Sequence, residues 1–374
     1  MRYCQKCILP DTRPHLIIME DGICNACHSW TDKKFDINWK SREEDFVQLV
    51  QTIKNKHASW DCVIPVSGGK DSTWQVIKAL EYGLKPLCVT WRTPARSTLG
   101  QKNLDNLIQL GVDHIDFSIN PKIEKEFTLK AFQKAGSLAI PMHMALFAIP
   151  LQTAINFKIP LVLWGENSGM EYGGSNEKLL SFKMTQEWLR TYGVTQGTVA
   201  QDWVDKDLTL KDLSVYFWPT DKEMQKADVT AAFLGWYFPW DPLETYKISK
   251  NYGFEALTSK PKTGYYQFAD VDDEFIITIH HWLKWYKFGF TRLWDNLSLE
   301  IRSNRMTREQ AIDIVYKTKE ENPEEAINKF CKYVGIQKTQ FFTIAESFRN
   351  QEIWSYQNDK WHLNNFLIPE WSWA

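Results

Sequence analysis

A short polar stretch, residues 67–72, carries the groups of this chain that are best suited to bind phosphate. It has the sequence Ser-Gly-Gly-Lys-Asp-Ser and follows an apolar run, residues 62–66, that indicates a buried strand. Apolar residues at helical spacing then predict a helix over residues 71–80. A glycine-rich turn at a helix N-terminus presents N–H groups to an anion, which the helix dipole also favours. We therefore predict that a phosphate group is bound by Ser67, Gly68, Gly69, Lys70, Asp71 and Ser72.

The spacing of this loop differs from the two commonest phosphate-binding motifs. It is neither G-x-x-x-x-G-K-[ST] nor G-x-G-x-x-G. It resembles the signature of the PP-loop ATP pyrophosphatases, which include NAD synthetase, GMP synthetase and tRNA-thiolating enzymes. That resemblance implies that the loop holds the β,γ-pyrophosphate of ATP while a substrate oxygen attacks the α-phosphate. An ordinary connection between a strand and a helix is the alternative interpretation.

The N-terminal region contains two Cys-x-x-Cys pairs whose spacing is typical of a tetrahedral zinc site. Disulfides are the alternative, which a reducing cytoplasm disfavours. His15 and His28 could each replace a cysteine ligand, but four cysteines already complete the shell. A closed shell leaves no position for a substrate, so the role is structural. We predict that zinc is bound by Cys4, Cys7, Cys24 and Cys27.

Strands and helices alternate through the middle of the chain, which predicts a parallel sheet with helices on both faces, a PP-loop/HUP-like α/β fold. In such sheets the ligand lies at the carboxyl ends of the strands. Besides the elements around the motif, we expect strands at 84–91, 112–119 and 159–164 and helices at 36–56, 101–110, 124–135 and 143–157.

Two further loops follow predicted strands and carry polar groups. Arg92 and Arg96 suit bidentate contacts with phosphate or carboxylate, although surface salt bridges would explain them as well. Glu166, Asn167 and Tyr172 follow the strand at 159–164, where helix capping is the alternative for the first two. We predict substrate contacts for Arg92, Arg96, Asn167 and Tyr172.

The character of the sequence changes near residue 235, where an aromatic, proline-broken segment predicts a domain boundary. Beyond it, an acidic stretch at 270–275 could hold magnesium or cap a helix. Either His280 or His281 could serve as a proton shuttle. A capping box at Thr307 starts a helix, and the remainder is expected to be mainly amphipathic helix with an aromatic tail. The predicted domains are a zinc-binding module (1–35), an ATP-binding α/β domain (36–235) and a mainly helical substrate or partner domain (236–374).

The bulk composition is that of a soluble protein with balanced charge. The chain has 44 basic and 46 acidic residues and a net charge of −2, which argues against a surface built for nucleic acid. The start of the sequence does not resemble a signal peptide. The most apolar stretch, 138–151, contains two prolines and is too short to span a bilayer. We expect a cytoplasmic protein without a membrane partner.

Five blocks of sequence together resemble the N-acetyl sugar amidotransferases, bacterial enzymes of surface-glycan biosynthesis (lipopolysaccharide or flagellin glycans). The blocks are the two cysteine pairs, 64–72, 164–174, 281–290 and 300–309. One departure is the segment 291–295, Thr-Arg-Leu-Trp-Asp, where Gly-Arg-Ala-Thr-Asp is usual in the family. The resemblance implies ATP- and Mg²⁺-dependent conversion of a sugar acetamido group to an acetamidino group. Adenylylation of the amide oxygen precedes attack by ammonia, and AMP and pyrophosphate are released.

Within this reaction we predict catalytic roles for Lys70, Asp71, Glu166 and His281. The substrate would be a sugar or nucleotide sugar. Cys62, Cys88 and Cys331 have the apolar neighbours of buried residues, so ammonia would come from solution or from a separate glutaminase subunit. A PP-loop tRNA thiolase is the main alternative, and a zinc-bearing scaffold that binds nucleotide without turnover is another.

Overall fold

The central element is a five-stranded parallel sheet with the strand order β3-β2-β1-β4-β5. The computed structural model describes residues 1–174, 179–318 and 322–369. The strands are β1 (Cys62–Pro65), β2 (Pro86–Trp91), β3 (Asp113–Phe117), β4 (Leu161–Trp164) and β5 (Thr230–Phe233).

The chain reverses its direction across the sheet between β1 and β4. It first builds outward from β1 through β2 to β3, and then returns to place β4 and β5 on the other side of β1. In parallel sheets of this kind, a crevice opens at the carboxyl ends of the two strands where the order reverses. The loops after β1 and β4 therefore flank the expected ligand position.

Helices cover both faces of the sheet, as the alternating pattern predicted. One face packs against apolar side chains of α2, α3, α4 and α10, and the other packs against those of α5, α6 and α8. These helices are α2 (Trp39–Lys54), α3 (Lys70–Glu81), α4 (Thr98–Ile108), α5 (Pro121–Ala135), α6 (Ala139–Asn156), α8 (Gln186–Tyr192) and α10 (Leu234–Tyr237). Shorter pieces in the same half of the chain are α7 (Ser168–Tyr172), α9 (Asp221–Lys226), η2 (Ala200–Trp203) and η3 (Ser214–Tyr216).

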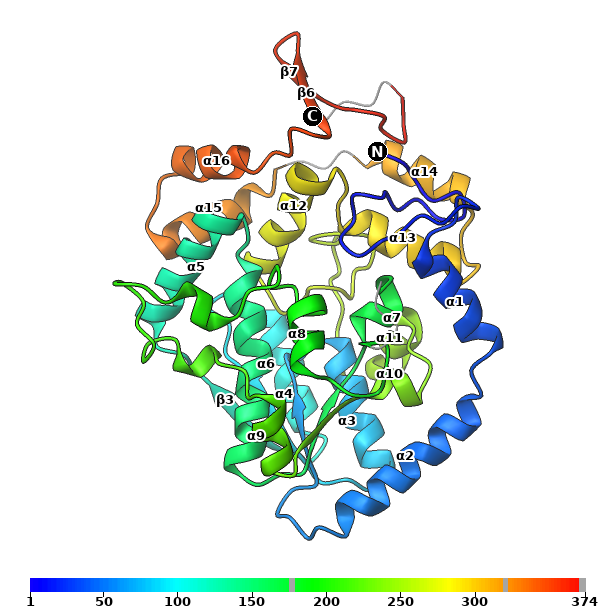
Figure 1. The fold of residues 1–374 in the computed structure, drawn as a ribbon, viewed down its shortest axis with the longest axis vertical. Helices are drawn as coiled ribbons and strands as arrows, with labels where there is room; N and C mark the ends of the chain where they lie inside the picture. Colours follow the sequence, from blue (N-terminus) through cyan, green and yellow to red (C-terminus); the bar gives the residue numbers. More distant parts are fainter. Residues whose placement is uncertain (175–178, 319–321, 370–374) are drawn as a thin grey trace.

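The C-terminal region is mainly helical and shares one apolar core with the N-terminal segment. That core joins the four N-terminal cysteines to side chains of α12 through α16, and Figure 1 shows the N-terminal segment beside α13 and α14. The elements are α1 (Asn25–Phe35), α11 (Pro242–Asn251), α12 (Ile276–Phe288), α13 (Arg292–Arg302), α14 (Arg308–Lys317), α15 (Glu324–Val334), α16 (Lys338–Ser347), β6 (Trp354–Gln357) and β7 (Lys360–Leu363).

Most predicted elements are present, and the structure differs from the prediction in two places. β5 was not predicted, because its Thr-Ala-Ala-Phe sequence is short and weakly apolar and depends on pairing with β4. The predicted tail contains an antiparallel hairpin, β6–β7, rather than helix alone, and residues 370–374 lie outside the described chain. The capping box at Thr307 is confirmed at the start of α14. None of the helices in the described ranges combines the length and the apolarity needed to cross a membrane.

Candidate functional site

The loop between β1 and α3 has the geometry of an anion-binding turn. No side chain caps α3 in the described chain, so the N–H groups of its first turn are open to a ligand. Gly68 adopts φ +87°, and a Cβ there would lie 2.7 Å from the Gly100 carbonyl oxygen and the Leu104 nitrogen. Ser67 Oγ accepts from the Gly69 N–H at 3.2 Å. Glycine is thus required at position 68 because the loop passes directly against α4.

The charged pair at the start of α3 is held by the segment that precedes and begins α11. Lys70 Nζ lies 2.5 Å from Asp71 Oδ2, and the lysine side chain is 7% exposed. The other carboxylate oxygen of Asp71 accepts from Trp240 Nε1 at 3.1 Å and from Thr245 Oγ1 at 3.2 Å. An aspartate at this position could cap the helix or orient Mg²⁺. These contacts exclude the cap and leave a carboxylate that is 37% exposed.

Glu166 follows β4 and lies in the electrostatic field of this pair. Burial raises its pKa to about 7, the carboxylate of Asp71 adds to the shift, and Lys70 and Arg292 oppose it. The structure therefore brings together three of the four residues predicted to be catalytic, Lys70, Asp71 and Glu166. They come from the two loops at the point where the strand order reverses.

Asn167, predicted to contact the substrate, has a structural position instead. Its Oδ1 accepts from the Gly169 N–H at 3.1 Å and from Trp188 Nε1 at 3.0 Å. Its Nδ2 donates to the carbonyl oxygens of Leu179 and Ser181 at 3.4 and 3.3 Å. All four hydrogen-bonding positions of the amide are used inside the protein, so it caps α7 and orders the loop.

Arg92 and Arg96 both form ion pairs with one carboxylate, that of Asp116. Arg92 Nε lies 2.9 Å from Asp116, and Arg96 binds the same carboxylate through both terminal nitrogens at 2.7 and 2.8 Å. Arg96 also donates to Gln101 at 2.9 Å. The salt-bridge interpretation that the sequence left open is the observed one. A substrate contact by the terminal nitrogens of Arg96 would have to displace its ion pair, whereas Arg92 pairs through Nε and its side chain is 57% exposed.

A cationic residue that the sequence analysis did not assign to the site is Arg292, at the start of α13. Burial disfavours its charge, but the surrounding groups outweigh burial and raise its pKa. Those groups are Tyr172, Asp295, Asp270 and Glu166. Its Cζ lies 5.5 Å from the centroid of the Tyr172 ring, and Arg13 Cζ approaches the same ring at 5.4 Å. Its only signal in the sequence was its place in the segment 291–295.

The acidic stretch before α12 serves several purposes. Asp273 Oδ1 accepts from the N–H groups of Phe275 and Ile277, both at 3.0 Å, so this residue caps α12. Burial raises the pKa of Asp272, and hydrogen bonding to Ser67 of the phosphate loop opposes that shift. Asp270 lies 3.4 Å from His281 Nδ1. The stretch therefore connects the phosphate loop with His281.

The four N-terminal cysteines form a cluster that fits a tetrahedral metal. Their Sγ atoms all lie within 4.8 Å of one another and are buried. Cys4 Sγ accepts from the N–H groups of Cys7 and Cys24 at 3.4 and 3.2 Å. Arg302 is 2% exposed beside the cluster; burial disfavours its charge, but Cys7, Cys27 and Cys24 outweigh burial and raise its pKa. Because a buried cation needs nearby negative charge, this arrangement fits a zinc ion held by thiolates.

The two histidines considered as replacement ligands are engaged elsewhere. His28 Nε2 lies 3.0 Å from Asp21, and the His15 ring packs edge-on against Tyr192 with centroids 5.1 Å apart. Among the residues that the structure describes, the cluster consists of the four cysteines.

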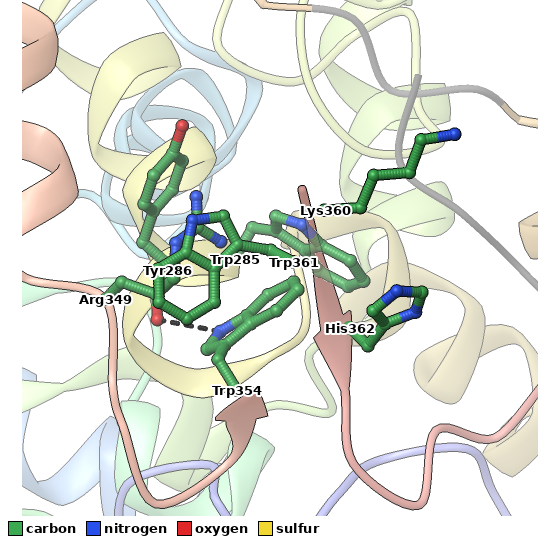
Figure 2. Close-up of a pocket in the computed structure, with 7 residues that line it drawn as sticks. All are labelled: Trp285, Tyr286, Arg349, Trp354, Lys360, Trp361 and His362. Carbon is green, nitrogen blue, oxygen red and sulfur yellow. Dashed lines mark hydrogen bonds between the residues drawn. The ribbon is translucent and has the colours of Figure 1, made fainter. Parts of the chain in front are cut away.

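Away from these residues, the C-terminal hairpin and α12 enclose a cavity of about 220 Å³ (Figure 2). The guanidinium of Arg349 lies 4.2, 4.7 and 4.8 Å from three aromatic ring centroids, and Glu346 neutralises it. The lining residues are Trp285, Tyr286, Arg349, Trp354, Lys360, Trp361 and His362. None of them belongs to the predicted site, and Arg349 already interacts with the rings that a cationic ligand would use.

Comparison with known proteins identifies the C-terminal region. Residues 251–367 match the family described as "LPS biosynthesis protein WbpG-like, C-terminal domain". This region contains Asp270, His281 and Arg292, and the match supports the family resemblance predicted from the sequence. No curated protein matches the chain.

Several solved structures share limited similarity with the chain. NMN synthetase from Francisella tularensis is 16% identical over 60% of this chain and 99% of its own, with a TM-score of 0.28. NH3-dependent NAD synthetase from Campylobacter jejuni is 17% identical over 57% of this chain and 93% of its own, with a TM-score of 0.28. A predicted subunit of tRNA methyltransferase from Methanocaldococcus jannaschii is 14% identical over 62% of this chain and 91% of its own, with a TM-score of 0.28.

Proposed function

Since residues 251–367 form a WbpG-like C-terminal domain, we propose that this chain is an ATP-dependent, AMP-forming amidotransferase of surface-glycan biosynthesis. Its substrate is a sugar or nucleotide sugar whose acetamido group becomes acetamidino. The proposal is supported by one observation: the phosphate loop and that domain contribute charged residues to the same site. Arg292 of the domain interacts electrostatically with Glu166, which in turn interacts electrostatically with Lys70 and Asp71.

An amide needs activation because its carbonyl is a poor electrophile and its oxygen is a poor leaving group. The amide oxygen attacks the α-phosphorus of ATP, and the bond to the β-phosphate breaks. The open N–H groups at the start of α3 and the ammonium of Lys70 stabilise the departing pyrophosphate. Ammonia then forms a bond to the amide carbon, AMP leaves with the former amide oxygen, and one proton is lost from nitrogen.

The donor set beside the loop fits a divalent cation. The carboxylates of Asp71 and Glu166 repel each other, and oxygen ligands of this kind suit Mg²⁺. When bound there, Mg²⁺ would neutralise phosphate charge during adenylylation. Asp71, with its partly exposed carboxylate, is the residue we assign to hold it.

Ammonia is proposed to come from solution or from a separate glutaminase subunit. All seven cysteines are buried, so none is accessible as a glutaminase nucleophile. The same observation argues against the tRNA-thiolase alternative. Burial raises the pKa of Cys62 well above its usual value and that of Cys88 to about 12, which disfavours a sulfur-carrying thiolate near the loop.

The test is AMP and pyrophosphate release by the purified protein with ATP, Mg²⁺ and ammonium. The acceptors are a panel of acetamido sugars, each free and nucleotide-linked, their free-amine counterparts and bulk tRNA. Amidine formation should require the acetamido group, and a heavy-oxygen label in its carbonyl should appear in AMP. The matched control is Lys70→Met, which should abolish the reaction. AMP release only with tRNA would contradict the proposal and favour the thiolase.

A further inference from the structure

Three side chains, one on α12 and two from the segment before it, form a short series of hydrogen bonds. Thr263 Oγ1 lies 2.7 Å from Asp270 Oδ2 and 2.9 Å from His281 Nδ1. The direct distance from His281 Nδ1 to the same carboxylate oxygen is longer, 3.4 Å. The hydroxyl therefore lies between the carboxylate and the imidazole.

The positions of the hydrogens follow from the ionisation of Asp270. Burial would raise the pKa of this carboxyl, but His281, Arg292 and Thr263 together hold it well below its usual range, so it is a carboxylate. A carboxylate only accepts hydrogen bonds, and Thr263 has a single hydroxyl hydrogen, which it must donate to Asp270. The Thr263 oxygen is then left to accept from His281, whose Nδ1 must carry a hydrogen.

The imidazole itself is neutral. Burial lowers the pKa of His281 to about 4, and Asp270 opposes that shift only in part. Charged or titratable groups face it from the preceding loop, its own helix, α13 and α6; these are Asp270, His280, Lys284, Arg292 and His143. A neutral imidazole with hydrogen on Nδ1 has a lone pair on Nε2.

The Nε2 atom is the part of the ring available to a reactant. No hydrogen bond to Nε2 occurs within the described ranges, and this atom is not among the fully buried polar atoms that lack a partner. The side chain is 10% exposed. Arg292 connects this position with Glu166 and the phosphate loop, because both Asp270 and Glu166 act on its guanidinium.

We propose that Thr263 and Asp270 are positioning residues that fix His281 in the Nδ1–H tautomer, so that its Nε2 accepts the proton lost when ammonia replaces the amide oxygen. This role rests on the proposed function. In that step the new C–N bond forms, the C–O bond to AMP breaks, and one proton passes from the incoming nitrogen to Nε2. No oxidant or further reactant is involved.

The first test observes the tautomer and does not depend on turnover. Long-range ¹H–¹⁵N spectra of ¹⁵N-histidine-labelled protein, with His281→Gln for assignment, should show hydrogen on Nδ1 and a bare Nε2. Thr263→Ser keeps the hydroxyl and should keep this pattern. Asp270→Asn replaces a carboxylate, which only accepts hydrogen bonds, with an amide that can donate one to Thr263. The hydrogen on the His281 ring should then shift toward Nε2. A wild-type ring with hydrogen on Nε2, or an unchanged pattern in Asp270→Asn, would overturn the inference.

The second test separates the two chemical steps. Asp270→Asn should slow amidine formation by about 10²-fold or more, as wrong-tautomer carboxylate-to-amide changes do in histidine-dependent enzymes. Exchange of labelled pyrophosphate into ATP with the acetamido sugar and no ammonia should stay within about twofold of wild type. Thr263→Val should resemble Asp270→Asn, and Thr263→Ser should resemble wild type. Equal loss in Thr263→Ser and Thr263→Val would contradict a role of the hydroxyl. Failure of wild-type exchange with every sugar would instead refute the proposed function, whereas the spectra still test the tautomer.

Discussion

Trp240 Nε1 donates a hydrogen bond to Asp71 Oδ1 at 3.1 Å, although the two residues are 169 positions apart in the sequence. The aromatic segment that predicts a domain boundary thus supplies a contact to the phosphate loop. Thr245 donates to the same oxygen, and Lys70 lies against the other one. The orientation of the Asp71 carboxylate therefore depends on α11 and the segment before it as much as on α3.

Replacing Trp240 by Phe should lower the rate of AMP formation about tenfold. The ring is kept, but Asp71 loses a hydrogen bond to a charged acceptor, which contributes about 1.5–3 kcal/mol. Trp236→Phe is the control, because that indole packs against Arg42 with 3.2 Å from Cζ to the ring centroid. Initial rates of pyrophosphate release measure both variants. Equal rates in the two variants would contradict the assigned role.

The neighbouring glycines of the loop should respond differently to alanine. Gly68→Ala places a Cβ 2.7 Å from backbone atoms of α4 at φ +87°, so we expect a loss of at least about 2 kcal/mol in the free energy of unfolding and no AMP formation. Gly69 has φ −73°, and its Cβ would meet Ser67 Oγ at 3.2 Å and no other atom of the described residues within 4 Å. Gly69→Ala should therefore stay within about 1 kcal/mol of wild type. Urea unfolding compares the pair, and similar losses would argue against the close approach to α4.

Much of this site could be predicted locally, and the rest depends on contacts that are distant in sequence. The loop 67–72 and the cysteine pairs carry their geometry in their own spacing, and alternating strands and helices placed Glu166 beside the loop. The environments of Arg92 and Arg96 depend on Asp116 from another strand, which no spacing reveals. Likewise, Asn167 looks the same in sequence whether it caps α7 or binds substrate.

Glu166 should give the reaction a pH dependence near neutrality. Its pKa is raised to about 7, so its carboxylate form, the form able to accept a proton or bind a cation, becomes populated as pH rises through that value. The kcat/KM for ATP, measured at constant free ammonia, should therefore rise with pH to a plateau above about 7. Glu166→Gln should remove this rise of kcat/KM with pH, and Glu81→Gln, at the end of α3, should keep it. If kcat/KM still rose with pH in Glu166→Gln, another group would be responsible for the rise.

Glu124 should make the fold less stable at neutral and higher pH than at pH 4.5. It is 5% exposed, and burial raises its pKa to about 7 although Trp91 Nε1 donates to it at 2.7 Å. Because the folded-state pKa lies above the unfolded value, folding favours the protonated acid, and stability falls as pH rises from about 4.5 to about 7. Glu124→Gln keeps the acceptor without the charge and should raise the free energy of unfolding by about 2–3 kcal/mol at pH 8 and not at pH 4.5. Glu126→Gln, on the same helix, is the control. Urea unfolding at both pH values measures these effects, and a gain that is equal at both would exclude ionisation of Glu124 as the cause.

The cysteine cluster should stabilise both the N-terminal segment and the C-terminal helices, because α13 and α14 supply side chains that surround it. Arg308 Nε donates to the Cys7 carbonyl at 3.0 Å, and Arg302 Nη1 donates to the Glu171 carbonyl at 2.8 Å in the loop after β4. Loss of a metal here would leave Arg302 buried beside neutral thiols. We therefore expect Cys24→Ser to lose bound zinc and about 3 kcal/mol or more of the free energy of unfolding.

Cys331→Ala is the matched control for this change, because that cysteine is buried on α15 outside the cluster. This variant should keep zinc, measured by elemental analysis. Its free energy of unfolding should fall only by the small amount expected for one truncated side chain. Arg302→Met keeps the bulk and removes the charge, so it should speed the loss of zinc to a chelator while the four cysteines remain. If Cys24→Ser retained stoichiometric zinc, or if wild type contained none after growth in zinc-replete medium, the cluster would not be a zinc site. Unchanged chelation kinetics in Arg302→Met would instead show that its guanidinium does not stabilise the thiolates.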